Sequence, residues 1–362
     1  MGPDGSNGET DEATSEETGT TTGPENLTRA VWDVDPEAFP AGEGIESQAR
    51  FLLRYAVLAP SSHNSQPWAF AVDGGTVAVS GDEERWLTAT DPDMREFHLS
   101  IGCAVENLCV SAERFGFSAE VTYTRAADED EDEDEGDVVA TVALQPDGEH
   151  AAARPPGLFE AITERATSHA PFEERPLAPG LRDRLEQCVE GDVELLVVED
   201  PDTLAAIGAL QATADEALMN DPAYRRELGH WIGLGALGSG WLAARVGRLV
   251  VTHLDLGARE GRKNATLLGS APAVGVLATP SDDAIERVRA GRVFERIALA
   301  ATAEGVDVHP KSQTLERPEY RRQLADLLDL DGARPQHLFR IGHAPDDEEH
   351  TPRWPVGSVL RE

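Results

Sequence analysis

The stretch "LAPSSHNSQPWAF", Leu58–Phe70, places a block of polar residues between two ordered elements. Upstream, residues 47–59 carry apolar side chains at helical spacing, and this helix must end at Pro60 because proline disfavours helix in the preceding residue. Downstream, "WAFAV" and "TVAVS" flank Asp73-Gly74-Gly75, a pattern typical of a β-hairpin. An exposed linker would contain such polar residues, whereas a turn built to hold a polar group explains better why they lie between a helix and a strand.

The composition indicates a globular protein with an unusually acidic surface. The chain has 362 residues, 40% of them hydrophobic, which is enough for one large domain or two ordinary ones. Lys and Arg number 31 against 67 acidic residues, giving a formal net charge of −36. Such a surface keeps a chain hydrated at high salt, so we expect the cytosol of a halophilic organism. It argues against nucleic acid as a partner, because phosphate binding needs a basic face.

Cysteine usage and hydropathy indicate a cytoplasmic location. Cys103, Cys109 and Cys188 form no C-x-x-C pair, so we expect buried thiols in a reducing compartment rather than disulfides or metal ligands. The N-terminus lacks a basic-then-apolar signal region. The most apolar segment, residues 231–251, contains two arginines and falls short of what a membrane span needs. We therefore expect a soluble protein without a membrane partner.

Low-complexity segments and the order of the elements predict an α+β fold. Residues 1–26 contain no large apolar residue and are expected to form a disordered acidic tail. The run "DEDEDEDEGD" (128–137) lies between two strand-like segments and reads as a solvated hairpin loop; a metal site is the alternative, but no ligand spacing supports it. Helices are predicted up to Gly116 and over 285–303, with strands at "VELLVV", "AVGVLAT" and "HLFRI".

Several catalytic motifs are absent or misleading. The segment "GLGALG", Gly233–Gly238, matches the dinucleotide-binding pattern, but a helix-like segment precedes it where a strand is required. A glycine-rich helix contact or a mobile lid explains it better. The histidines lack metal-ligand spacing, and there is neither a G-x-S-x-G elbow nor a P-loop. We therefore expect no metal, and no hydrolase or nucleotide-hydrolysing activity.

The polar stretch resembles the flavin-contacting turn of the nitroreductase-like FMN oxidoreductases, whose pattern is A-P-S-x-x-N-x-Q-P-W. The positions carried over from the family are Pro60, Ser61, Ser62, Asn64, Gln66, Pro67 and Trp68. Short hydroxyl and amide side chains on a tight turn suit the pyrimidine end of a flavin, which presents hydrogen-bond donors and acceptors. The resemblance implies that this turn contacts FMN.

A second segment, "ERATSHAPFEERPL" (Glu164–Leu177), resembles the family's R-x-[ST]-x-[KR]-x-x-F element. The resemblance implies that Arg165 binds the FMN phosphate and that Thr167 contacts the ribityl chain or the pyrimidine ring. His169 replaces the usual Lys or Arg near flavin N1 and O2. A histidine is cationic only part of the time near neutral pH, so it would stabilise the negative charge of a reduced flavin less well.

Two further segments extend the resemblance towards the C-terminus. "EGVDVHPKSQ" resembles the loop along flavin N5, and it implies contacts from Pro310, Lys311, Ser312 and Gln313. "TPRWPV" resembles the family's closing segment and offers Arg353 as a second cation for the phosphate. The alternative for Arg353 is a surface arginine paired with the abundant carboxylates.

The order of these motifs predicts an internal pseudo-dimer. In ordinary family members the arginine element precedes the serine turn, and each FMN lies between two subunits. In this chain Arg165 follows Pro60 by 105 residues, and neither half contains both motifs. This order resembles the Acg-type branch of the family. It implies a nitroreductase-like α+β fold with halves at 27–150 and 151–362, fused in a monomer with one complete FMN site.

The resemblance implies an FMN-dependent oxidoreductase. Hydride would pass from NAD(P)H through flavin N5 to a small-molecule acceptor, a nitroaromatic, a quinone or a similar compound, and no side chain would act as a catalytic nucleophile. An FMN storage or sequestration protein without turnover is the alternative, because Acg-type members can cover the flavin with a lid. We expect such a lid at "GHWIGLGALGSGW", Gly229–Trp241. A third hypothesis, that the protein is an acidic interaction protein, is supported only by its charge.

Overall fold

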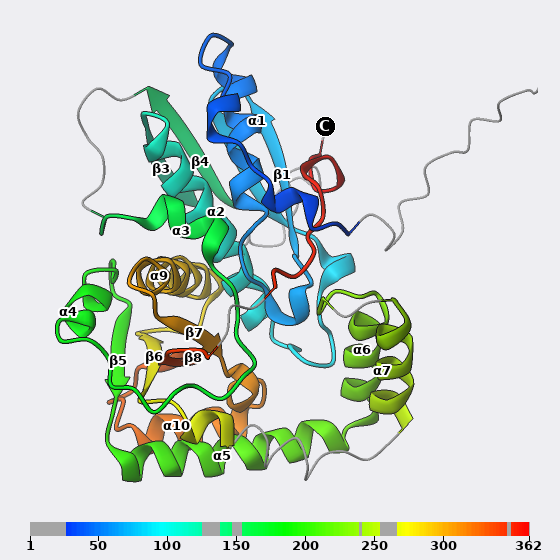
Figure 1. Cartoon of the computed structure of the whole chain (residues 1–362), viewed down its shortest axis with the longest axis vertical. Coiled ribbons are helices and arrows are strands. Elements are labelled where there is room, and N and C mark those ends of the chain that lie inside the picture. The colour runs from blue at the N-terminus through cyan, green and yellow to red at the C-terminus, as the bar shows by residue number, and fades with distance from the viewer. Residues whose placement is uncertain are drawn as a thin grey trace, which may run out of the picture.

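The computed structural model has two antiparallel sheets with two long helices packed between them (Figure 1). The structure describes residues 27–124, 138–146, 154–238, 241–253, 266–345 and 349–361. The predicted tail (1–26) and the predicted acidic loop (128–137) lie outside these residues. The strands on either side of that loop, however, pair antiparallel as predicted.

The first sheet contains the hairpin predicted from the sequence. Its strand order is β1-β2-β4-β3, with every neighbouring pair antiparallel. The elements of this half are α1 (Ile45–Ala56), β1 (Trp68–Asp73), β2 (Thr76–Gly81), α2 (Arg95–Arg114), β3 (Phe117–Tyr123) and β4 (Val138–Pro146). The Asp91 carboxylate accepts the backbone N–H of Phe97 at 2.9 Å, which satisfies a free donor in the first turn of α2.

The second sheet repeats this arrangement in the order β5-β6-β8-β7. Its elements are α3 (Leu158–Glu164), α4 (Leu181–Glu186), β5 (Glu194–Val198), α5 (Pro201–Asn220), α6 (Pro222–Gly233), α7 (Trp241–His253), β6 (Ala273–Thr279), α9 (Ala284–Ala303), β7 (Asp307–Pro310), α10 (Pro318–Leu327) and β8 (Arg334–Gly342). The sequence interpretation missed β7, whose four residues are too few to show an alternating pattern.

Local irregularities repeat between the halves, which supports the predicted internal pseudo-dimer. A register shift lies between Val79 and Ser80 of β2, and another lies between Leu277 and Ala278 of β6. Both central helices, α2 and α9, have 20 residues. The main difference is an insertion: β1 and β2 are joined by a tight turn, whereas α5, α6 and α7 separate β5 from β6 along the chain. In Figure 1, α5 runs along the lower edge of the second half, with α6 and α7 at one end.

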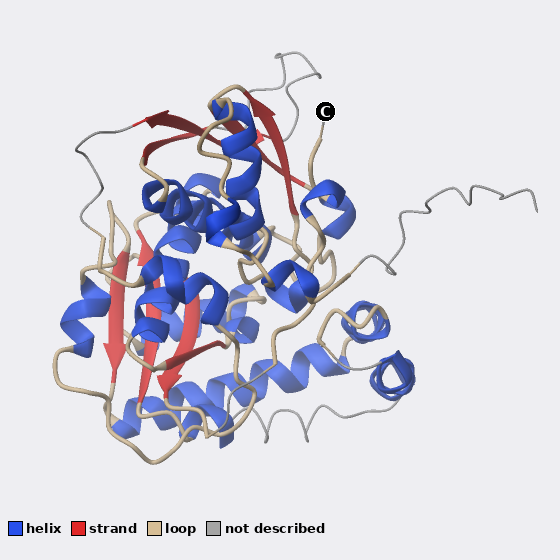
Figure 2. Cartoon of the chain, turned by 45° about the horizontal axis from the view of Figure 1, so that its top comes forward, coloured by secondary structure: helices blue, strands red, loops and turns tan. Residues whose placement is uncertain are grey.

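The central helices cross at two glycines. A methyl group on Gly102 of α2 would overlap the carbonyl oxygen of Val288, and one on Gly291 of α9 would overlap the carbonyl oxygen of Leu99. Only glycine allows the two backbones to approach this closely. Figure 2 shows helices lying between the strands of the two sheets. Residues around most of the circumference of α2 and α9 are buried, as expected of helices packed inside the molecule.

The C-terminal segment crosses back to the first half. Phe70 of β1 donates its N–H to the Val359 carbonyl oxygen at 2.8 Å, and Arg361 donates to the Phe70 carbonyl oxygen at 2.7 Å. These bonds extend the edge of the first sheet and hold residues 349–355 beside the polar turn that precedes β1. The second half thereby places residues beside the polar turn of the first half.

The cysteine prediction is confirmed: Cys103, Cys109 and Cys188 are buried free thiols. No helix within the described part of the chain is long and apolar enough to cross a bilayer.

Candidate functional site

The polar turn before β1 is ordered and strained. Its residues His63, Asn64 and Gln66 have φ values of 49°, 54° and 54°, a left-handed conformation that is uncommon for residues other than glycine. The Ser61 hydroxyl oxygen accepts the backbone N–H of Gln66 at 2.9 Å and closes the turn. Strained backbone of this kind persists only where the surroundings fix it, and it concentrates at functional sites. The linker interpretation is therefore wrong.

Two buried amide side chains attach the turn to distant segments. Gln66 donates its amide to the Asn64 carbonyl oxygen at 3.1 Å and accepts the N–H of Trp354 at 2.8 Å. Asn64 donates to the carbonyl oxygens of Pro352 and Ala236, both at 2.8 Å. The Asn64 Oδ1 atom is buried and has no hydrogen-bond partner among the described residues. The turn thus retains one acceptor that a ligand could use.

Arg165 and Arg353, which lie 188 positions apart in the sequence, meet at one backbone carbonyl. Arg165 ends α3 and is 6% exposed, whereas Arg353 lies in the C-terminal segment and is 3% exposed. Their guanidinium groups donate to the Leu58 oxygen at the long distances of 3.5 and 3.4 Å. The Nε–H of each has no hydrogen-bond partner within the described residues. Arg353 is therefore buried, and the alternative of a surface arginine is wrong.

Glu295 of α9 faces these arginines and was not identified from the sequence. Its Oε1 lies 3.7 Å from Arg165 Nε, and its side chain has no exposed surface. Burial raises the pKa of Glu295 to about 7, although Arg165 and Arg353 act to lower it. Burial also lowers the pKa of Arg353 to about 9, helped by repulsion from Arg165. We call Glu295, Arg165 and Arg353 the Glu295 centre.

The other two residues of the arginine element lie in different surroundings. Thr167 is half-buried, and its hydroxyl accepts from Arg165 Nη1 at 3.4 Å. His169 is exposed, and its ring packs edge-on against His309 with 4.7 Å between the centroids. Thr167 therefore belongs to the Glu295 centre by contact, whereas His169 lies at the surface.

The turn and the predicted N5 loop meet through two residues that the sequence interpretation missed. The Ser62 hydroxyl donates to Glu96 Oε2 at 2.8 Å, and the Ser312 hydroxyl lies 3.2 Å from His337 Nδ1. Glu96 and His337 are 3.8 Å apart and buried. Burial alone would raise the pKa of Glu96, but the nearby His337 ring and the hydrogen bond from Ser62 outweigh it and lower that pKa. No sequence motif marks either residue, since they sit on α2 and β8.

The rest of the predicted N5 loop is also fixed. Pro310 ends β7, and the buried Lys311 donates its N–H to the Leu338 carbonyl oxygen at 2.7 Å. Gln313 accepts from the Gln211 amide at 2.9 Å, which ties the loop to α5. The loop is therefore held by both β8 and the inserted helices.

Of the predicted lid segment, Gly229–Trp241, the described residues 229–238 contact the polar turn through Ala236. Beyond its contact with Asn64, Ala236 is fully buried and packs with Trp231 and Leu87. The Glu227 carboxylate of α6 accepts the N–H groups of Ala89 and Thr90 at 3.0 and 2.8 Å. Because α6 rather than a strand precedes Gly233–Gly238, this stretch lacks the strand that a dinucleotide-binding turn requires.

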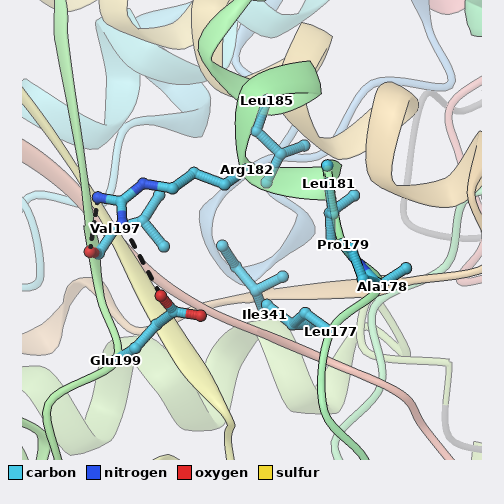
Figure 3. Close-up of a pocket in the computed structure, with 10 residues that line it drawn as sticks. Leu177, Ala178, Pro179, Leu181, Arg182, Leu185, Val197, Glu199 and Ile341 are labelled. Carbon is cyan, nitrogen blue, oxygen red and sulfur yellow. Dashed lines mark hydrogen bonds and ion pairs between the residues drawn. The ribbon is translucent and has the colours of Figure 1, made fainter.

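A separate cleft of about 200 Å³ lies between α4 and β5 (Figure 3). Leu181, Val197 and Ile341 line it, and Arg182 spans its mouth to Glu199. It contains none of the residues expected to contact a cofactor, and it is smaller than a typical ligand pocket. We assign no role to it.

Comparison with known proteins identifies the family. A Mycobacterium tuberculosis protein named "Putative NAD(P)H nitroreductase" is 30% identical over 351 residues, covering 92% of this chain and 97% of the relative. The chain belongs to this NAD(P)H nitroreductase family. Another nitroreductase-family relative from the same organism, with the same name followed by "acg", is 27% identical over 329 residues, covering 85% of this chain and 93% of its own. The predicted resemblance to the Acg-type branch is thus confirmed.

One solved structure of the nitroreductase family is an "FMN and NADPH-dependent nitroreductase NfnB" from sphigopyxis sp. strain HMH. It matches 57% of this chain and 98% of its own at 16% identity, with a TM-score of 0.41. No protein-family model matches the chain.

Proposed function

We propose that the protein is an FMN-dependent oxidoreductase that passes hydride from NAD(P)H to a nitroaromatic, a quinone or a similar small acceptor. The observation that carries this proposal is the convergence of Arg165 and Arg353 beside the strained turn at Asn64. When bound, FMN supplies the hydride-transfer chemistry, and the protein supplies binding, orientation and electrostatics.

The Glu295 centre fits a phosphate group. Arg165 and Arg353 are desolvated, each keeps a free Nε–H, and the nearest carboxylate lies beyond hydrogen-bond reach. A buried charge without full hydrogen bonding is costly. A phosphate dianion between the two guanidinium groups would complete their hydrogen bonds, and charge-assisted contacts of this kind are the strongest available. We therefore propose that both arginines bind the FMN phosphate.

The remaining predicted contacts fit the other parts of FMN. We propose that the turn and the N5 loop bind the flavin ring, with Thr167 and His169 along the ribityl and N1 side. The turn contributes Pro60, Ser61, Ser62, Asn64 and Gln66, and the loop contributes Pro310, Lys311, Ser312 and Gln313. Gln66 has both ends of its amide in internal hydrogen bonds, so its role is to hold the turn.

One alternative is an FMN store without turnover, in which the segment around Ala236 would act as a closed lid. Asn64 donates to Ala236, so this segment lies directly over a proposed flavin contact. A lid that stayed closed would exclude NAD(P)H and the acceptor. Oxidoreductase turnover and storage make opposite predictions about reduction of the bound flavin.

We also infer the setting of the protein from its composition and its repeat. The net charge of −36 suits the cytoplasm of a halophilic organism and disfavours nucleic acid as a partner. We propose two nitroreductase-like halves that meet near residue 150, in a monomer that binds one FMN.

A spectrum of the purified protein tests the function. We expect flavin absorption bands that bleach when NADPH is added in air-free buffer and recover when a quinone or nitroaromatic follows. Flavin that is bound but never bleaches would establish the storage alternative. Mass in solution and flavin released on denaturation should give one FMN per monomer, whereas an obligate dimer with shared sites would contradict the fused arrangement.

Replacing Arg165 by alanine tests the phosphate assignment. We expect FMN affinity to fall roughly 10- to 100-fold, the effect of losing a hydrogen bond between charged groups, with the fold retained. Fluorescence titration with FMN measures it. Arg182→Ala is the matched control, because that arginine is about half exposed beside the cleft of Figure 3. Full FMN binding by Arg165→Ala would refute the assignment.

A further inference from the structure

Glu295 is a buried carboxylate whose surroundings do not satisfy it. It has no exposed surface, and in the part of the chain that the structure describes neither of its oxygens meets hydrogen-bond geometry with a partner, although the Asn107 side chain is near enough to lower its pKa slightly. Its nearest cation, Arg165 Nε, is 3.7 Å away. An ionised carboxylate is costly to bury in this way, whereas a protonated one is much less so. The site therefore suits a group that changes its charge.

The groups facing this carboxylate come from three parts of the fold. They are Arg165 at the end of α3, Arg353 of the C-terminal segment, and Cys103, Glu106 and Asn107 of α2. Burial raises the pKa of the Cys103 thiol well above its usual value, so it stays neutral. His350 lies beside both arginines, and burial lowers its pKa, so it is uncharged at neutral pH and above.

A count of charges shows why Glu295 matters for phosphate. A bound phosphate monoester carries close to two negative charges at pH 7. The two guanidinium groups of Arg165 and Arg353 balance that charge, and none then remains for an ionised Glu295. Another buried carboxylate, Glu106, adds repulsion and raises the pKa of Glu295. Phosphate and an ionised Glu295 therefore compete for the same two cations.

We propose that Glu295 is a third member of the phosphate site, which pairs with the two arginines in the absence of FMN and takes up one proton from solvent when the phosphate binds. Glu295 acts through the arginines and is a positioning residue rather than a catalytic one. The proposal rests on the proposed function, because it assumes that Arg165 and Arg353 bind the FMN phosphate.

The consequence is an affinity for FMN that depends on pH in a defined direction. Burial raises the pKa of Glu295 to about 7, so above that pH the proton must be taken up at binding. By linkage, FMN affinity then falls by up to about tenfold for each further pH unit. Riboflavin, which lacks the phosphate, has no such competition and should bind with an affinity that does not change over this range.

The experiment is a titration of flavin-free protein with FMN and with riboflavin between pH 6.5 and 8.5 at constant high salt, followed by flavin fluorescence. Three proteins are compared: wild type, Glu295→Gln, and Glu160→Gln as a control that removes an exposed carboxylate from α3. Calorimetry at pH 8 in buffers of different ionisation enthalpy counts the protons taken up per FMN, and this measurement on the wild type needs no variant.

We expect the wild type and the Glu160 variant to lose FMN affinity with rising pH and to take up nearly one proton. Glu295→Gln should bind FMN without proton uptake, and more tightly than the wild type at pH 8.5. Wild-type binding without proton uptake, or unchanged uptake in Glu295→Gln, overturns the role of Glu295 and leaves the FMN assignment intact. A wild type that binds riboflavin and FMN equally at every pH overturns the phosphate site, and one that binds neither overturns the proposed function.

Discussion

The two central helices each place a glutamate four residues after the glycine at which they cross, yet the two glutamates have opposite surroundings. On α2, Glu106 follows Gly102, and on α9, Glu295 follows Gly291. Glu106 accepts hydrogen bonds from three guanidinium groups, two of them buried and one partly buried; we call it and these arginines the Glu106 centre. Its arginines and their contact distances are Arg296 at 2.6 Å, Arg154 at 2.9 Å and Arg292 at 3.1 Å.

The two glutamates differ because each is faced by the other central helix, and only α9 carries arginines at the facing positions. One and five residues after its glycine, α9 has Arg292 and Arg296, which reach Glu106. At the same positions α2 has Cys103 and Asn107, which leave Glu295 without a helix-borne cation. The chain supplies cations to Glu295 from α3 and from the C-terminal segment instead.

The Glu106 centre is a complete ion network, whereas the Glu295 centre is an incomplete one. In the Glu106 centre, Arg292 and Arg296 also contact Glu190, so the arginines have carboxylate partners of their own. Although burial alone would raise the pKa of Glu106, Arg154 and the two helix arginines hold it well below the usual range. In the Glu295 centre, guanidinium donors are left over. At the two equivalent positions, one glutamate is thus neutralised by arginine hydrogen bonds and the other is not, as the proposed phosphate site requires.

Neutralising each glutamate in turn tests most directly whether the two glutamates differ. Glu106→Gln removes the carboxylate shared by the two buried arginines Arg292 and Arg296, and we expect the unfolding free energy to fall by about 3–5 kcal/mol, the usual cost of breaking a buried ion pair. Glu295→Gln removes a carboxylate with no hydrogen bonds and should cost nothing at pH 8. Urea unfolding of flavin-free protein at constant high salt measures both. Equal losses would show that the two centres are alike.

The pH dependence of stability also distinguishes Glu295 from Glu106. Burial raises the pKa of Glu295 from 4.5 to about 7, so its contribution to stability is fully present below pH 4.5 and is lost as pH rises through 7. Glu106 has the opposite sign, because its pKa is depressed: its contribution is lost only in acid.

Between pH 5 and pH 8, the wild type should therefore lose up to about 3 kcal/mol of stability relative to Glu295→Gln, at 1.36 kcal/mol for each pKa unit. Urea midpoints of the two proteins at several pH values give this difference directly. A constant difference across the window would mean that Glu295 keeps one charge state throughout.

Much of the fold could be predicted because its signals are local. The hairpin could be predicted from Asp73-Gly74-Gly75 between two strand-like segments, and α2 and α9 from their long repeats of apolar residues. The site motifs were also recognisable, since Ser61, Asn64 and Arg165 lie in short patterns with fixed spacing.

The electrostatic residues of the site could not be predicted in the same way. Glu295 and Glu96 are single carboxylates inside helices, in a chain with 67 acidic residues, and no spacing distinguishes them. Their importance depends on burial and on partners more than 50 residues away, such as Arg353 and His337. Such contacts follow from how the two halves pack, which no local pattern records.

The smallest expected effect concerns the crossing itself, where the two halves should be equivalent. Gly102→Ala and Gly291→Ala each add a methyl group that overlaps a carbonyl oxygen of the opposite helix, Val288 or Leu99. Overpacking of this kind costs about 1–3 kcal/mol, and the carbonyls are backbone atoms that cannot rotate away. We expect similar losses of unfolding free energy from the two variants, because the clash has the same geometry on both helices. Alanine at a solvent-exposed helical position such as Glu216 of α5 is the control. A cost at only one glycine would mean that the crossing is asymmetric, and the contrast between Glu106 and Glu295 would then reflect helix position rather than the arginines.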